Sequence, residues 1–212
     1  MFTLRSKLVV CLALLAGEGM VLAQGITPPV AEFRGFKAEG SFRIDNSTDQ
    51  AISVVLETKS FTVADDGKVV YSPLESTIRI DLGASSFVIP SHDNRSVYYK
   101  AISSRSPASF SIVPTMTPII HGTGVRMNFR IPHMIYIYQK AKLTKADVQV
   151  ALKDGKVRIA NTSEKLGRIE FIHAGSDDLA GFPLYPGQTR EIAISGSKAS
   201  VHFEEGFKVD VN

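Results

Sequence analysis

The chain has little cysteine, no tryptophan and no long apolar run after its first residues. Its single cysteine, Cys11, lies among residues 1–23, and the remaining 189 residues have none. Without a thiol there, disulfides and a cysteine nucleophile are excluded. No run after residue 23 reaches the roughly 18 apolar residues that predict a membrane-spanning helix. We therefore expect no membrane insertion.

An excess of charge of one sign is also missing. Without Arg5, Lys7 and Glu18, which lie in residues 1–23, 22 of the 24 basic and 20 of the 21 acidic residues remain, a net charge of +2. This balance argues against a nucleic-acid partner, because such partners select strongly basic surfaces.

Residues 1–23 have the pattern of a cleaved export signal. Arg5 and Lys7 form a basic start, residues 8–16 form a short apolar run, and Val21-Leu22-Ala23 supplies small residues before Gln24. We therefore expect an exported, soluble protein that begins at Gln24.

Sustained helical periodicity is absent as well. Residues 24–142 contain short alternating runs separated by turn signals such as Asp65-Asp66-Gly67, a pattern typical of an antiparallel β-sandwich. Residues 143–212 repeat the pattern, with a tight hairpin expected at Asp154-Gly155. The prediction is an all-β protein of two immunoglobulin-like β-sandwich domains, 24–142 and a smaller one over 143–212.

The two halves share matched segments. Phe42-Arg43-Ile44-Asp45-Asn46-Ser47-Thr48 parallels Val157-Arg158-Ile159-Ala160-Asn161-Thr162-Ser163, and Ile89-Pro90 parallels Tyr185-Pro186 further along. Two landmarks in the same order indicate two copies of one sandwich plan. Both asparagines also fit a glycosylation sequon, but a turn at a strand end explains each of them.

The stretch from Gly124 to Lys140 differs from the other strands. Its first half alternates four apolar residues with Arg126, Asn128 and Arg130; the apolar ones are Val125, Met127, Phe129 and Ile131. Pro132 interrupts the pattern and belongs at an edge or a bulge. Residues 134–138 are then continuously apolar, as in a strand covered on both faces. We expect one long strand whose second half is in the core and whose first half offers an apolar stripe at an open edge, although an ordinary half-buried strand also fits.

No constellation of catalytic residues is present. The five histidines are scattered and lack the spacing of metal ligands; they are His92, His121, His133, His173 and His202. The G-x-S-x-G motif is missing, and His121-Gly122-Thr123-Gly124 precedes a strand, so it is not a phosphate-binding loop. The sequence therefore predicts a binding protein with no catalytic residues, no metal and no cofactor.

Together these features resemble the periplasmic pilus chaperones of the chaperone–usher pathway. The resemblance rests on the export signal, the two sandwich-like halves, the 125–131 alternation, the strand end at Ile44–Thr48 and the motif Tyr185-Pro186-Gly187-Gln188-Thr189-Arg190. It implies a periplasmic protein that binds pilus (fimbrial) subunits and delivers them to an outer-membrane usher. It also implies that Val125, Met127, Phe129 and Ile131 are donated to the groove of a subunit that lacks its last strand.

The chain departs from that family at the anchor of the subunit's terminal carboxylate. Val30 and Ile135 stand where the best-known members have an arginine and a lysine, which indicates a divergent, archaic or alternative branch. Arg34, His133 and Lys140 are the candidate substitutes. We also expect the free protein to cover its open edge by self-association, because an exposed edge strand aggregates readily.

A structural pilus subunit or a surface adhesin built from similar sandwiches is the alternative. Subunits of that pathway usually carry a disulfide and an N-terminal donor extension, whereas residues 24–29 are short and include Pro28 and Pro29. A secreted enzyme or a sugar-binding module would need a cluster of polar or aromatic residues that the sequence does not reveal.

Overall fold

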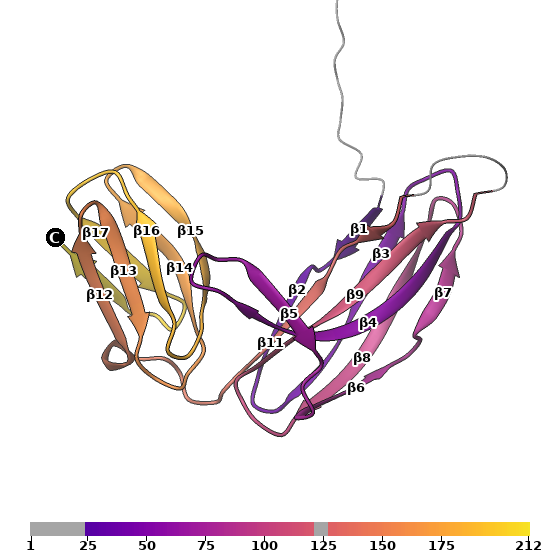
Figure 1. Cartoon of the computed structure of the whole chain (residues 1–212), viewed down its shortest axis with the longest axis horizontal. Helices are drawn as coiled ribbons and strands as arrows, with labels where there is room; N and C mark the ends of the chain where they lie inside the picture. The colour runs from indigo at the N-terminus through magenta and orange to yellow at the C-terminus, as the bar shows by residue number, and fades with distance from the viewer. Residues whose placement is uncertain (1–23, 121–126) are drawn as a thin grey trace, which may run out of the picture.

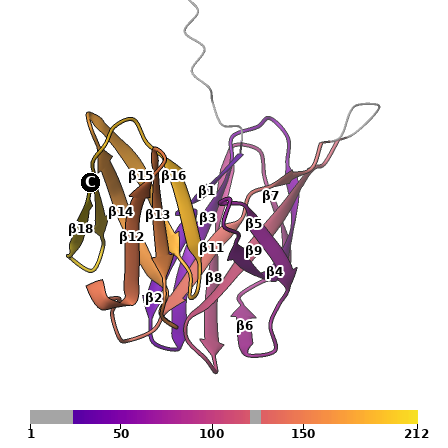
Figure 2. The same cartoon turned by 60° about the vertical axis from the view of Figure 1, so that its left-hand side comes forward.

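The computed structural model describes residues 24–120 and 127–212, and the predicted export signal lies outside this part of the chain. The described residues form two β-sandwiches connected by one linker after β11 (Figures 1 and 2). Their one helical element is the 3₁₀ turn η1 (Lys145–Asp147). In these two ranges no helix is both long and apolar enough to cross a membrane. The predicted all-β class with two immunoglobulin-like sandwiches is confirmed.

The first sandwich has two sheets. The smaller sheet has the order β1-β3-β8-β6, with β1 (Gln24–Thr27), β3 (Lys37–Asn46), β8 (Asp93–Ser103) and β6 (Ile78–Leu82). The larger sheet has the order β2-β11-β9-β4-β5, with β2 (Val30–Arg34), β11 (His133–Tyr138), β9 (Ala108–Pro118), β4 (Ile52–Val63) and β5 (Val69–Pro73). Two short strands lie off this path: β7 (Ser86–Ile89) pairs with β4, and β10 (Phe129–Arg130) pairs with β9.

The second sandwich is smaller. One sheet has the order β12-β13-β16, with β12 (Val148–Lys153), β13 (Lys156–Asn161) and β16 (Thr189–Ala193). The other has the order β15-β14-β17-β18, with β15 (Asp177–Leu184), β14 (Gly167–Ala174), β17 (Ala199–Phe203) and β18 (Lys208–Val211). Each sandwich has its own apolar core, one running from Ile26 to Ile137 and the other from Leu143 to Phe203. The exact boundary between residues 142 and 143 stays a prediction.

Two predicted turns are confirmed. Asp66-Gly67 lies in the β4–β5 hairpin, where Gly67 has a φ of 87° and Asp66 Oδ1 accepts a bond from the Lys68 amide. Asp154 and Gly155 join β12 to β13 with φ values of 52° and 69°. Positive φ at both central residues matches the twist of the flanking strands.

The matched segments of the two halves are equivalent in structure. Asn46 is buried, and its side-chain amide donates to the carbonyls of Gln50, Ile89 and Pro90. Asn161 is also buried and donates to the carbonyls of Lys165 and Leu184. Each asparagine Oδ1 accepts bonds from a residue two positions later, which closes the turn. The interpretation of both sequons as strand-end turns agrees with this geometry.

Gly35, with a φ of 106°, bends the chain from the end of β2 into β3. One expected strand is also divided. The single strand expected over 124–140 is β10 followed by β11, with Ile131 and Pro132 between them. Pro132 has no N–H to give to the ladder, which explains the interruption.

Side chains from both sandwiches meet between them. A buried cluster combines Phe61, Tyr136 and Tyr138 of the first sandwich with Leu166, just before β14. Arg168 Nη1 lies 2.7 Å from Glu32 Oε1, and the Tyr185 hydroxyl donates to Ser109 Oγ at 3.0 Å. These contacts indicate that the relative orientation of the sandwiches is specified by side-chain packing.

The β4–β5 hairpin adds a second connection. It reaches from the first sandwich toward the second (Figure 1), where the Gln188 side-chain amide donates to the Val63 carbonyl at 2.7 Å and to the Ala64 carbonyl at 3.2 Å. Arg190 lies beneath Gly67 and over the Phe182 ring, 4.4 Å from its centre. The hairpin thus packs on residues that the sequence places in the Tyr-Pro-Gly-Gln-Thr-Arg motif.

Four buried tyrosines predict how the stability of the folded protein changes at alkaline pH. Burial raises the pKa of Tyr99 and of Tyr136 to about 12, and it also raises the pKa of Tyr138 and Tyr185. Because these phenols hold their protons more tightly in the folded state, stability is full below about pH 10 and falls as the pH rises beyond it. In absorbance titrations, we expect these four of the six tyrosines to ionise together with unfolding. Ionisation near pH 10 without loss of structure would contradict the buried cluster.

Candidate functional site

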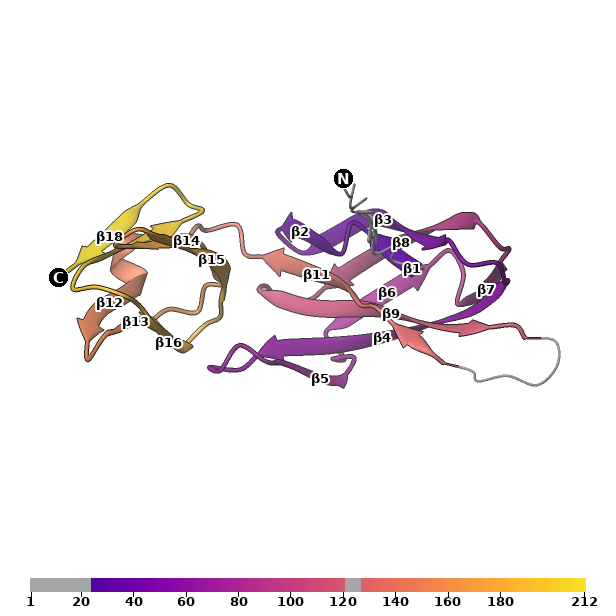
Figure 3. The same ribbon diagram turned by 90° about the horizontal axis from the view of Figure 1, so that it is seen from above.

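The candidate site is the unpaired flank of β10. Along one side of β9, β11 pairs with residues 108–112 and β10 pairs with Thr115 and Met116. The other flank of β11 is covered by β2, which runs parallel to it from Val30 to Arg34 (Figure 3). Among the described residues, no strand pairs with the other flank of β10. The sheet therefore has an open edge just before β11.

This opening arises where the first strand of the fold changes sheets. β1 pairs with β3 in the smaller sheet, and the chain then crosses at Pro28 and Pro29 to the larger one. The Met134 amide donates to the Pro29 carbonyl at 2.8 Å, so β2 begins only opposite Met134. A first strand that stayed in the larger sheet would have been available to cover β10. The crossover leaves that flank free.

The four predicted donor residues differ in their surroundings. Val125 lies outside the described residues. Met127 is 59% exposed and Phe129 is 38% exposed, while Ile131 is partly buried against the core of the first sandwich. The register pairs Phe129 with the buried Met116, so its side chain points to the same side of the sheet as the core residues. Met127 and Phe129 therefore form an apolar stripe along the open edge, which we call the donor stripe.

The polar side chains between them are held on the opposite face. Arg130 Nη2 lies 2.6 Å from Glu57 Oε2 of β4, and the Thr117 hydroxyl donates to Asn128 Oδ1 at 3.0 Å. Both contacts connect residues 128–130 to the outer face of the larger sheet. They hold the polar side chains of this segment on the outer face, so that the donor stripe lies on the side of the core.

The three candidate anchors are not equivalent. His133 is fully buried, and both of its ring nitrogens have partners inside the protein, so we do not retain it as an anchor for a partner's carboxylate. Arg34 lies over the Tyr138 ring, 5.2 Å from its centre, and Lys140 is exposed. A side chain at Gly35 would lie 3.8 Å from Lys140 Cε, so Arg34 and Lys140 share the end of β2.

Val30 and Ile135, which stand at the family's two anchor positions, lie in different surroundings. Ile135 is fully buried in the core of the first sandwich, and Val30 begins β2 beside Met134. The structure also reveals residues that no sequence pattern pointed to, above all the ion pair of Glu32 and Arg168. These two residues are 136 positions apart, and nothing in the local sequence of either indicates the contact.

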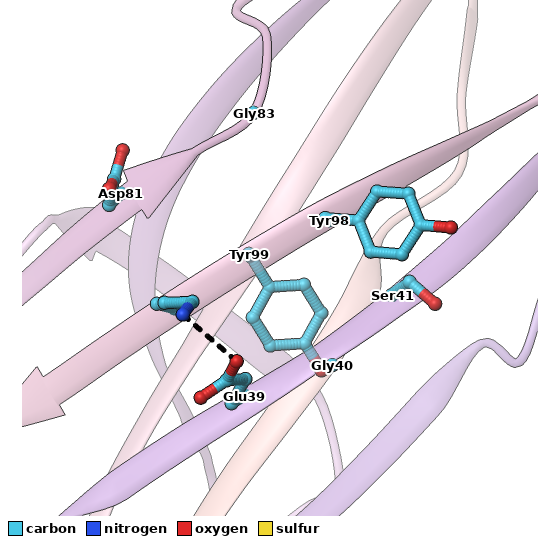
Figure 4. Close-up of a pocket in the computed structure, with 8 residues that line it drawn as sticks. Glu39, Gly40, Ser41, Asp81, Gly83, Tyr98 and Tyr99 are labelled. Carbon is cyan, nitrogen blue, oxygen red and sulfur yellow. Dashed lines mark ion pairs between the residues drawn. The ribbon is translucent and has the colours of Figure 1, made fainter.

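A shallow pocket lies elsewhere, on the outer face of the smaller sheet (Figure 4). It measures about 360 Å³ and is lined by Glu39, Gly40, Ser41, Asp81, Gly83, Tyr98, Tyr99 and Lys100. Lys100 Nζ pairs with Glu39 Oε1 at 3.1 Å across it. Across the described residues no group of three or more His, Cys, Asp or Glu side chains is arranged to hold a metal ion. The pocket shares no residue with the donor stripe.

Comparison with known proteins shows which solved structures this fold resembles. No protein-family model and no curated protein sequence matches the chain. Among solved structures, a chain of the CsuC–CsuE chaperone–tip adhesion subunit complex from the archaic chaperone–usher Csu pili of Acinetobacter baumannii matches with a TM-score of 0.52 and 15% identity. The match covers 89% of this chain and 97% of that one.

Two further structures agree. The Salmonella enterica SafA pilin–SafB chaperone complex matches with a TM-score of 0.59 and 9% identity, over 88% of this chain and 92% of that one. The periplasmic chaperone SfaE matches with a TM-score of 0.51 and 10% identity, over 89% of this chain and 98% of that one. The resemblance inferred from the sequence is thus confirmed at the level of the fold: the chain is similar in structure, over nearly its whole described length, to chaperones of the chaperone–usher pathway.

Proposed function

We propose that this chain is a periplasmic chaperone of pilus subunits that completes the fold of a subunit with its own strand. The observation that carries the proposal is the unpaired flank of β10 with the exposed donor stripe, in a fold similar to those of pilus chaperones and their complexes. The function involves binding and no catalytic step. No feature of the described residues favours the alternative of a structural subunit or adhesin.

The physical basis is strand addition at an open edge. The free backbone groups on the outer flank of β10 can form main-chain hydrogen bonds with a strand of the subunit, and the alternating side chains set the register. Burial of Met127 and Phe129 contributes about 1.5–3 kcal/mol for each side chain that becomes fully covered. Val125 would extend the stripe, while Ile131 supports it from the core side.

The partners follow from this role. The bound partner is a pilus subunit whose apolar groove lacks a strand, and the complex delivers the subunit to an outer-membrane usher. Arg34 and Lys140, at the end of β2, are the proposed contacts for a charged group of the subunit. In the absence of a subunit, we propose that two copies associate through the same edge, because an uncovered apolar edge strand favours pairing.

Co-expression tests the proposal. A pilus subunit encoded beside this gene, with its N-terminal donor extension removed, is to be exported with and without this chain. We expect the subunit to be degraded or insoluble alone and to be recovered as a soluble one-to-one complex with the chain. Equal recovery of the subunit without the chain, or no complex with any neighbouring subunit, would contradict the function.

A further inference from the structure

His133 occupies the point where the open edge joins the core. It is the first residue of β11, directly after Pro132, and it is fully buried. Its Nδ1 lies 2.8 Å from the Pro28 carbonyl oxygen at the crossover between β1 and β2. Its Nε2 lies 3.1 Å from the Tyr99 hydroxyl on β8. The ring therefore connects the crossover, the smaller sheet and the strand that continues from the donor stripe.

These partners require a neutral imidazole. A carbonyl oxygen can only accept, so Nδ1 carries the proton, and Nε2 is then the acceptor for the Tyr99 hydroxyl. Protonation of Nε2 would remove that acceptor and place a charge in the core. Burial accordingly lowers the pKa of His133, although its bond to Pro28 opposes part of that shift.

Uncharged groups surround the imidazole. The Phe42 ring of β3 stacks on it with a centre-to-centre distance of 4.6 Å. On β9 the residue opposite His133 is Ile112, and on the crossover the contact is the Pro28 carbonyl. The titratable group that faces it is the Tyr99 phenol of β8, which is uncharged at neutral pH, and burial raises its pKa further. None of these contacts supplies a negative charge to stabilise an imidazolium.

We propose that His133 is an acid-sensitive latch. The neutral side chain holds the crossover at Pro28 and the end of the donor stripe nearest β11 in place, and the protonated side chain releases them. The proposal rests on the proposed function, since it describes the regulation of the same site. An imidazolium still donates from Nδ1 to the Pro28 carbonyl, so the release does not come from loss of that bond. The charged ring, which can no longer accept from the Tyr99 hydroxyl, leaves the core, and the crossover and the start of β2 move with it. Subunit capture should then weaken at acidic pH before the sandwich as a whole unfolds.

The direction of the effect follows from linkage. The folded state binds the His133 proton more weakly than the unfolded state does, so the stability contribution is complete above about pH 6.5, the ordinary pKa of histidine. It declines as the pH falls from there toward the lower pKa of the folded state. Exposed histidines such as His92, which pairs with Asp49 at the surface, do not share this environment.

The test combines proton titration and backbone exchange on the free protein with capture of the truncated pilus subunit described above. NMR should show His133 as the Nδ1–H tautomer, titrating below pH 6.5. Amide exchange at residues 30–32 and at residues 133 and 134 should accelerate between pH 7.5 and pH 5, after correction for intrinsic rates, while β4 stays protected. Subunit affinity should also be lower at pH 5 than at pH 7.5, in step with the faster exchange.

Variants separate the latch from a general effect of acid. His133→Gln should remove the pH dependence of exchange at these positions, and His92→Gln should leave it unchanged. Tyr99→Phe, which removes the donor to Nε2 and keeps the ring, should move the acid response to higher pH. The same tests on the free protein need no partner, so they decide the latch even if the His133 variant folds poorly.

The outcomes are distinct for the two claims. A wild-type protein that captures the subunit equally at pH 7.5 and pH 5, or whose exchange near His133 does not change with pH, overturns the latch and leaves the chaperone function intact. A protein that captures no subunit at any pH overturns the proposed function. The exchange and titration results then still decide whether His133 controls the crossover.

Discussion

Replacing Met127 and Phe129 together with aspartate is expected to weaken subunit capture more than a hundredfold without unfolding the protein. Both side chains are exposed on the open edge, at 59% and 38%, so the folded chain loses little by the change. In the complex the same positions lie in an apolar groove. There the variant would lose the burial of two large side chains and would bring two carboxylates out of water, a cost well above the about 2.7 kcal/mol of a hundredfold change.

Affinity for the truncated subunit, measured by titration calorimetry or by competition, checks this result. Tyr98→Asp combined with Ile102→Asp is the matched control, because these side chains are exposed on the outer face of the smaller sheet, at 68% and 53%, away from the open edge. The control should bind the subunit as the wild-type protein does. Equal loss in both variants would indicate a general charge effect, and undiminished binding of the Met127/Phe129 variant would remove the donor stripe from the mechanism.

The second large effect is expected at Asn46. Replacing it with alanine should destabilise the protein by about 3 kcal/mol, since the carbonyls of Gln50, Ile89 and Pro90 lose their donor and an unpaired buried polar group costs about 1–3 kcal/mol. The turn also loses the two bonds that Thr48 donates to Asn46 Oδ1. Urea unfolding followed by circular dichroism measures the change.

The equivalent asparagine provides an internal comparison. Asn161→Ala removes the donor to Lys165 and Leu184 in the second sandwich, so its destabilisation should appear in that sandwich and not in the first. Hydrogen exchange resolves the two. Asn94→Ala is the control at an exposed position of β8, where we expect a change of less than about 0.5 kcal/mol. A change of that size at Asn46 would show that its hydrogen bonds are replaced by water at no cost.

The parts of the fold that the sequence predicted depend on local physics. Alternation marks a strand with one buried face, so Met127 and Phe129 could be recognised from their spacing alone. Asp154-Gly155 and Asp66-Gly67 are turns because these residue types tolerate positive φ, and both lie where they were predicted. The parallel between Asn46 and Asn161 was also visible, because each closes a turn within its own segment.

The remaining features depend on contacts between distant segments. Whether β10 is an open edge is decided by β1, which pairs with β3 in the other sheet, and no pattern within residues 124–140 contains that information. His133 was a candidate substitute for the missing anchor residues, yet it is buried between Pro28 and Tyr99. Its role could not be inferred without knowing that these three residues, far apart in the chain, meet at the crossover.

Amide hydrogen exchange at residues 127–131, in the free protein and in the complex with the truncated subunit, tests the central claim most directly. The account predicts that backbone amides on the outer flank of β10 exchange rapidly in the dilute free protein and become strongly protected in the complex. Strong protection in the free monomer, or unchanged rapid exchange in the complex, would show that this flank does not receive the strand of a partner.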